Sequence, residues 1–135
     1  MKKTSHEQVK IHNMRLILRT IYNSDTISRA DVARVTKLTP TTVSDLTEEL
    51  INEGLVAEVG LGVSIGGKPP TLLSVPSNAR IAIGIDLGDN ELRGSLINLR
   101  GETLYTATVQ GNVKGDEAVN QVITLIDTLL QHVER

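Results

Sequence analysis

The sequence contains no cysteine and almost no aromatic residues, since Tyr22 and Tyr105 are the only two. Without cysteine, the chain has neither disulfides nor thiolate metal ligands. Without aromatic rings, it lacks the stacking platform that proteins use to grip single-stranded nucleic acid. His6, His12 and His132 lie far apart in the sequence, which favours surface histidines over a metal site. We therefore expect no metal and no cofactor.

Long apolar runs are also missing. No stretch of about 18 apolar residues is present for a membrane-spanning helix. The first residues lack the apolar segment of a secretory signal. We therefore expect a cytoplasmic protein. The apolar content of 39% is that of a globular chain, and 135 residues suffice for one or two small domains.

The charge balance gives little guidance about partners. The formal net charge is −2. Residues 1–75 carry nine Lys/Arg against eight Asp/Glu, and the remaining residues carry five against eight. Because neither part is strongly basic, any contact with nucleic acid must depend on where individual cations are placed.

The clearest local signal is residues 36–55, which contain a helix with both ends encoded in the sequence. Thr39 is a suitable N-cap, and Pro40 fits the first helical position, where its missing N–H is not needed. Gly54 is predicted to end the helix in a left-handed conformation that turns Leu55 back toward Leu50. Between these ends, an apolar stripe recurs at helical spacing: Val43, Leu46 and Leu50.

The opposite side of this helix carries small polar side chains near its N-terminus: Thr41, Thr42, Ser44 and Asp45. Hydroxyl groups bond to phosphates and base edges, so the pattern favours a helix laid in the major groove of DNA. For Asp45 there are two interpretations: it accepts from a cytosine amino group, or it supports a neighbouring arginine. We favour the second. A solvated acidic face is predicted for Glu48, Glu49 and Glu53.

Two helical patterns precede this one. Residues 7–23 place five apolar side chains on one face: Met14, Ile17, Leu18, Ile21 and Tyr22. Ser28 is predicted to cap a short helix that ends near Val35. A helix, a short helix, a three- to four-residue turn and a further helix follow the helix-turn-helix order. Strand signals at 55–59 and 71–75 then flank a glycine-rich tip, which predicts a winged variant.

Three cations are placed for contact with DNA. Arg29 begins the second helix, where that helix crosses the DNA backbone. Lys37 lies in the turn before the third helix, and Lys68 lies in the wing tip. The predicted DNA-binding residues are therefore Arg29, Lys37, Thr39, Thr41, Thr42, Ser44, Gly67 and Lys68.

A domain boundary is predicted at Pro76, Ser77 and Asn78, giving a first domain at 1–75 and a second at 76–135. Beyond the boundary, alternating apolar residues predict three strands, at 81–86, 92–99 and 103–109. A last helix follows, with Asp116 as its predicted cap. Its apolar stripe is either core or a dimer contact: Val119, Val122, Ile123, Ile126, Leu129, Leu130 and Val133. Three strands followed by a helix are the beginning of an α/β fold.

Two blocks of sequence resemble the ROK family of repressors and sugar kinases. Residues 38–56 and 66–75 are similar to that family's winged helix and its glycine–basic–proline–proline tip. Residues 81–102 are similar to the opening strands of its actin-like, sugar-kinase-like ATPase domain. The resemblance therefore implies the N-terminal portion of a ROK-family transcriptional regulator, as a piece or a truncated product. This portion is a winged helix-turn-helix followed by an incomplete actin-like α/β lobe.

The same resemblance implies a function. Such a regulator represses carbohydrate-utilisation genes, binds double-stranded operator DNA as a homodimer or higher oligomer, and responds to a sugar or phosphosugar. Lys68 stands where these regulators carry an arginine that enters the minor groove. Because lysine lacks the planar guanidinium group, we expect a less sequence-selective contact.

The main alternative is an ATP-dependent sugar kinase with an added N-terminal domain. Asp86 and Gly88 match the family's phosphate loop as weak remnants, but Asp89 and Asn90 replace its glycine–threonine pair. A carboxylate at position 89 would repel a phosphate. The family's catalytic aspartate, sugar-contacting segment and zinc loop have no counterpart in these residues. We therefore expect no enzyme and no catalytic residue; a winged helix that binds only proteins is the third alternative.

The actin-like fold also places a strand on each side of its first strand, and one of those neighbours comes from sequence absent here. An exposed strand edge pairs readily with another chain. We therefore expect either partial disorder beyond about Val75 or association through that edge.

Overall fold

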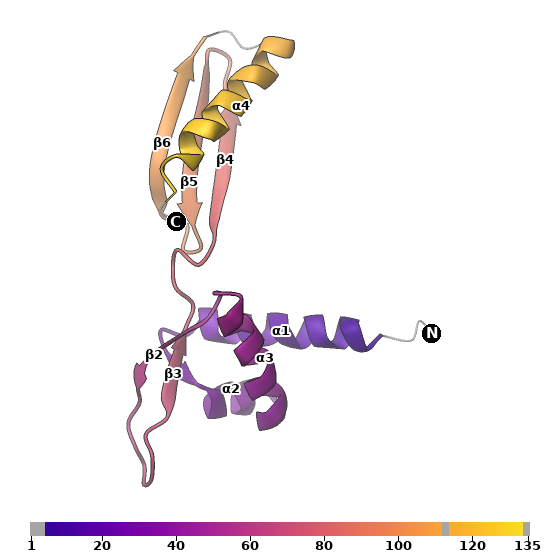
Figure 1. The fold of residues 1–135 in the computed structure, drawn as a ribbon, viewed down its shortest axis with the longest axis vertical. Helices are drawn as coiled ribbons and strands as arrows, with labels where there is room; N and C mark the ends of the chain where they lie inside the picture. The colour runs from indigo at the N-terminus through magenta and orange to yellow at the C-terminus, as the bar shows by residue number, and fades with distance from the viewer. Residues whose placement is uncertain (1–4, 112–113, 134–135) are drawn as a thin grey trace. The chain divides into compact units, whose positions relative to one another are not determined.

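The computed structural model describes residues 5–111 and 114–133, in two compact units, Met1–Ala79 and Arg80–Arg135 (Figure 1). The first unit contains α1 (His6–Tyr22), β1 (Ile27–Ser28), α2 (Arg29–Thr36), α3 (Pro40–Asn52), β2 (Ala57–Leu61) and β3 (Thr71–Ser74). The second contains β4 (Ile81–Leu87), β5 (Glu91–Asn98), β6 (Thr103–Gln110) and α4 (Asp116–Leu130).

Helix α3 has the two ends that its sequence predicts. The Thr39 hydroxyl accepts a hydrogen bond from the Thr42 N–H at 3.2 Å, and Pro40 is the first helical residue. At the other end Gly54 has a φ of 73°. Its N–H donates to the Ile51 carbonyl at 2.9 Å, and the Leu55 N–H donates to the Leu50 carbonyl at 2.9 Å. This pair of bonds is the Schellman arrangement, so both predicted caps are confirmed.

Gly54→Ala should lower the free energy of unfolding of the first unit by about 1 kcal/mol, because a β-carbon disfavours the left-handed backbone. An added Cβ meets nothing within 4 Å, so the effect is conformational and not steric. Thermal unfolding followed by circular dichroism measures it. Gly54→Asn is the matched control and should lose less, since asparagine tolerates this region. An unchanged melting temperature for the alanine variant would contradict the cap.

The core of the first unit lies where the three helices meet the small sheet. Its buried apolar side chains are Ile17, Ile21, Val32, Ala33, Val43, Leu46, Leu50, Val56, Leu73 and Val75. The predicted stripe of α3 is therefore confirmed, whereas Met14, Leu18 and Tyr22 of α1 are only half-buried. Thr47 is fully buried, and its hydroxyl has no hydrogen-bond partner among the described residues. Because threonine is polar, the apolar pattern of the sequence did not identify Thr47 as a core residue.

The first two helices begin and end close to their predicted bounds. Ser5 caps α1 through a reciprocal pair of bonds with Gln8, so this helix begins one residue before the predicted position 7. Ser28 caps α2 as predicted, accepting from the Asp31 N–H at 3.2 Å. Helix α2 continues to Thr36, one residue past the predicted end.

The wing is a hairpin of β2 and β3 within a three-stranded antiparallel sheet of order β1-β3-β2. The hairpin projects away from the helices (Figure 1). Strand β1 was not predicted; it is two residues long, and Ile27 pairs with Leu73 across the sheet. Strand β2 begins at Ala57, two residues later than predicted, and its register with β3 shifts between Glu58 and Gly60. These features establish a winged helix-turn-helix domain.

The second unit is an antiparallel sheet of order β4-β5-β6 with α4 lying across one face (Figure 1). Leu92 and Leu96 of β5 and Leu125 and Leu129 of α4 form its buried core. Gly94 lies beneath the helix, where an added Cβ would stand 2.7 Å from Leu129 Cδ1 and 3.0 Å from Leu125 Cγ. The absence of a side chain at Gly94 therefore allows the helix to approach the sheet closely.

One sequence prediction for α4 is wrong and another is correct only in part. Asp116 does not cap it: Gly115 is the N-cap, with a φ of 70° that glycine adopts readily, and it makes no side-chain cap bond. Of the predicted stripe, Leu129 is buried, and Val122 and Val133 pack against the core. Val119, Ile123 and Leu130 are 59%, 52% and 53% exposed, whereas Leu125, which the prediction omitted, is buried. Because α4 is apolar over a wide arc, its sequence alone does not show which side meets the sheet.

The expectation of disorder beyond Val75 is wrong for the described residues, since β4, β5, β6 and α4 are all formed. Within the part of the chain that the structure describes, β4 pairs only with β5. Association through the free edge of β4 stays a prediction.

Candidate nucleic-acid interface

The surface of α3 is divided into a buried and an exposed side. Thr39, Thr41 and Ser44 are exposed and Thr42 is half-buried, whereas the leucines of the same helix are buried. The capped N-terminal half of the helix thus presents hydroxyl groups to solvent. This is the geometry that a helix in the major groove requires.

The hydroxyl groups of α3 and its cap differ in whether they already make hydrogen bonds within the protein. The Thr39 hydroxyl donates to the Thr42 hydroxyl at 2.9 Å, which leaves the Thr42 proton available to another acceptor. Among the described residues, the side chains of Thr41 and Ser44 make no hydrogen bond. Three hydroxyl protons on one helix end are therefore available for phosphate or base acceptors.

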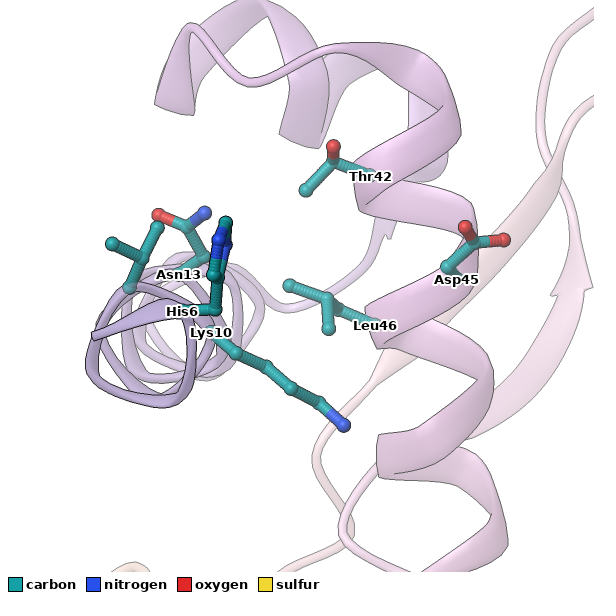
Figure 2. Close-up of a pocket in the computed structure, with 7 residues that line it drawn as sticks. His6, Lys10, Asn13, Thr42, Asp45 and Leu46 are labelled. Carbon is teal, nitrogen blue, oxygen red and sulfur yellow. The ribbon is translucent and has the colours of Figure 1, made fainter.

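A shallow, open pocket of about 240 Å³ separates α1 from α3. Figure 2 shows its labelled lining residues: His6, Lys10 and Asn13 from α1, and Thr42, Asp45 and Leu46 from α3. Ligand pockets for small molecules usually enclose about 300–1,000 Å³. This one is smaller and open, so it is a hollow beside the hydroxyl-bearing side of α3 and a poor sugar site.

An ion pair joins α1 to α3 below this hollow. Lys10 Nζ lies 2.9 Å from Glu49 Oε2. The hydrogen bond that the Lys10 ammonium donates to Glu49, and then the negative charge of Glu49, raise the pKa of Lys10. The residues are 39 positions apart, so no spacing in the sequence indicated this pair. The predicted arginine partner of Asp45 is wrong: within the described residues, no ion pair includes that carboxylate.

Lys37 ends α2 in an unusual backbone conformation. Its φ of 62° and ψ of 16° are left-handed, and it is the one non-glycine residue with positive φ in the described chain. Its N–H donates to the Ala33 carbonyl at 2.9 Å, which closes the helix. The exposed side chain stands in the turn directly before the cap of α3.

The wing tip is built from glycines and held by one side chain. Gly66 and Gly67 have φ values of 85° and 90°, and the Ser64 hydroxyl donates to the Gly67 carbonyl at 2.6 Å. Lys68 follows and is exposed, and Ile65, three residues before it, is 99% exposed. The wing tip therefore exposes one cation, Lys68, and one apolar side chain, Ile65, to solvent.

Arg29 differs from the other predicted contacts because its guanidinium is already paired. Its Nη2 lies 2.9 Å from Glu58 Oε1 of β2 and 3.9 Å from Glu48 Oε2 of α3. Glu48 and Glu49 were predicted to be a solvated face, yet both contact cations from other helices.

The predicted phosphate-loop remnants lie in the second unit: Asp86 is near the end of β4, where it pairs with Arg93, and Gly88 is in the turn between β4 and β5. Asp86 and Gly88 are exposed, and the Gly88 N–H donates to the Glu91 carbonyl at 2.9 Å. That donor is therefore used within the hairpin and is not directed at a ligand. In the described part of the chain, no cluster of three or more His, Asp or Glu side chains is arranged to hold a metal ion. No helix there is long and apolar enough to cross a membrane.

Comparison with known proteins places the first unit in a described family. Residues 12–57 match the family model "Winged helix-turn-helix DNA-binding". A xylose repressor of Caldicellulosiruptor bescii is 37% identical over 127 residues, covering 94% of this chain and 31% of that protein. The "DNA-binding transcriptional dual regulator NagC" of Escherichia coli (strain K12) is 31% identical over 96 residues, covering 71% of this chain and 24% of that protein.

A solved structure has the same fold. The crystal structure of a ROK family transcriptional regulator, a homolog of the E. coli MLC protein, superimposes with a TM-score of 0.73 at 24% identity. The match covers 91% of this chain and 32% of that one. This chain spans a third or less of the length of the curated relatives described above.

The fold, the exposed side of α3 and the family match define a winged helix-turn-helix protein of the DNA-binding class. Over a quarter to a third of their length the chain is similar to the xylose repressor and the transcriptional regulator named above, and it has the fold of the ROK family regulator.

Proposed function

We propose that the chain binds double-stranded operator DNA in a sequence-specific manner, as part of a repressor of carbohydrate-utilisation genes. The observation that carries this proposal is the exposed, hydroxyl-bearing N-terminal half of α3 beside a projecting wing. The names of relatives, a xylose repressor and an N-acetylglucosamine repressor, favour sugar genes as the targets.

In the proposed complex α3 lies in the major groove. Thr41, Thr42 and Ser44 bond to base edges and phosphates, and the threonine methyl groups pack on thymine methyls. Thr39 and Lys37 meet the phosphate backbone at the turn. Gly67 and Lys68 bring the wing tip to the minor groove, where the narrow glycine backbone permits close approach.

We further propose that residues 76–135 are the first part of an actin-like lobe whose remaining sequence, in a full-length regulator, binds a sugar or phosphosugar. Two copies on a two-fold operator would engage half-sites about one helical turn apart. A sugar-induced change in their separation would then weaken binding, since both half-sites must be matched together.

We propose no enzymatic activity. The relatives are named as a xylose repressor and a transcriptional dual regulator, and the Gly88 N–H in the turn after β4 donates within the hairpin. The sugar-kinase alternative needs a phosphate loop with free donors and a catalytic aspartate. The protein-interaction alternative requires a first unit that does not bind DNA.

A salt series separates these functions. The full chain is titrated onto a duplex enriched from a random-sequence pool by the chain itself, at several salt concentrations. The proposal predicts that the logarithm of the association constant falls linearly with the logarithm of salt concentration. Enrichment of no sequence, together with salt-independent or absent binding, would favour the protein-interaction alternative.

Lys68→Ala should weaken binding to all duplexes by a similar factor and reduce the salt slope by about one unit, because one phosphate contact is lost. Lys114→Ala is the matched control, since this lysine is also exposed in a loop but belongs to the second unit. Fluorescence anisotropy at several salt concentrations gives both quantities. If both variants keep the parent slope, Lys68 does not contact the DNA backbone.

A further inference from the structure

One arginine connects three elements of the first unit. Arg29 is the first residue of α2 and follows β1 directly. Its Nη2 lies 2.9 Å from Glu58 on β2, the outer strand of the wing, and 3.9 Å from Glu48 on α3. Since the sheet order is β1-β3-β2, the residue that directly follows one edge strand contacts the opposite edge strand.

The charges around Arg29 do not suit a phosphate partner. The guanidinium and the two carboxylates together carry a net charge of −1, which repels an anion at this point of the surface. The Arg29 side chain is 27% exposed, whereas those of Glu58 and Glu48 are 51% and 63% exposed. An approaching phosphate would thus meet the carboxylates before the cation.

Apart from its pairing with β3, the strand that Arg29 contacts is fixed by few buried side chains. Of the five residues of β2, only Ala57 is partly buried and the other four are exposed. The pairing of β2 with β3 is irregular between Glu58 and Gly60, so the regular ladder is interrupted at the residue that Arg29 contacts. A bulge of this kind bends and twists a strand locally, so the direction of the hairpin beyond it needs a further constraint.

We propose that Arg29 is a positioning residue that sets the direction of the wing relative to α3, through its ion pair with Glu58 and the nearby Glu48. In this role Arg29 holds the wing so that Lys68 at its tip and α3 can contact the DNA at the same time, and Arg29 itself does not bond to a phosphate. The consequence for DNA rests on the proposed function, but the effect on the wing does not.

The wing direction is measured without DNA. Because the chain has no cysteine, spin labels at Val63→Cys in the wing and Asn52→Cys at the end of α3 are the only thiol-linked ones. Both positions are exposed. Arg29→Ala should broaden the distance distribution between the labels. The double variant Arg29→Glu with Glu58→Arg should restore a narrow distribution, because it rebuilds the pair in reverse.

Arg34→Ala is the matched control. Arg34 lies on the same helix, but its ion pair, to Asp31 at 3.3 Å, stays within that helix. The control should therefore leave the distribution unchanged. An unaltered distribution in Arg29→Ala would overturn the proposal, and so would equal broadening in Arg34→Ala. Thermal unfolding of each variant shows whether broadening reflects loss of the fold.

DNA binding then separates positioning from direct contact. On the duplex enriched by the parent chain, Arg29→Ala should lose about fivefold in affinity, the scale of one partly exposed ion pair, with an unchanged salt slope. The reversed pair should recover most of this loss. A slope that falls by about one unit, without rescue by the reversed pair, would make Arg29 a phosphate contact and overturn the proposal. If the parent chain binds no duplex, the proposed function fails and the distance measurement alone decides the role of Arg29.

Discussion

Gly94→Val should lower the free energy of unfolding of the second unit by about 2–3 kcal/mol, in the upper part of the range of about 1–3 kcal/mol that is typical of overpacked cores. The added Cβ would stand 2.7 Å from Leu129 Cδ1 and 3.0 Å from Leu125 Cγ, both of which belong to buried side chains of α4. The leucine tip at Leu129 can rotate away, but Leu125 Cγ is a branch point, so moving it requires a new rotamer of a packed side chain or a shift of the helix. The γ-methyl groups of valine add to this conflict. Hydrogen exchange of the β5 amides, compared with those of α3, measures the loss unit by unit.

Gly84→Val is the matched control in the same sheet. Gly84 pairs with Ser95, the residue next to Gly94, so it belongs to the opposite face of the sheet. Its added Cβ would find only Ile97 Cδ1, at an ordinary 3.6 Å. Valine suits a strand better than glycine does, so this variant should be neutral or slightly stabilised. Equal losses at both positions would show that the space under α4 is not what Gly94 provides.

Ser44→Glu should weaken DNA binding by about a hundredfold, because like charges brought together at an interface oppose binding by several kcal/mol. Ser44 is exposed on the hydroxyl-bearing side of α3, so the longer side chain fits without disturbing the core. Glutamate is also a good helix former, and the fold should therefore be unaffected. Fluorescence anisotropy with the enriched duplex measures the affinity, and circular dichroism checks the helix content.

Asn52→Glu adds the same charge to the same helix at its other end. Asn52 is the last residue of α3, exposed and eight positions from Ser44. In the proposed complex this end points away from the groove, so the loss of affinity should be severalfold smaller. If Asn52→Glu weakens binding more than Ser44→Glu, the helix is docked in the opposite sense. If Ser44→Glu leaves affinity unchanged, α3 does not enter the groove.

The parts of the fold that could be predicted depend on short stretches of sequence. The caps at Thr39 and Gly54 follow from backbone donors and acceptors within a few residues, and both are as expected. The stripe of α3 follows from helical periodicity. The hairpin of the wing follows from glycines between two apolar runs. Each of these requirements is local, so one segment contains all the information needed.

The parts that could not be predicted depend on residues that meet only in the folded chain. Strand β1 has two residues, and only its pairing with Leu73 makes it a strand. The pair between Arg29 and Glu58 joins residues 29 positions apart. For α4, packing against the sheet determines which of several apolar positions is buried. The sequence of the helix alone does not contain that information. The sequence therefore predicts the candidate site as a set of hydroxyls and cations, but it does not indicate the pairing that distinguishes Arg29.

At Lys37, the residue that would be best for stability differs from the one that would be best for contact with DNA. Glycine or asparagine would adopt the left-handed backbone with less strain, so selection for thermal stability alone would replace the lysine. A chain selected to hold the DNA backbone at the turn before α3 would keep it. The residue at this position in natural variants of the protein therefore indicates whether selection for stability or selection for DNA contact has been stronger.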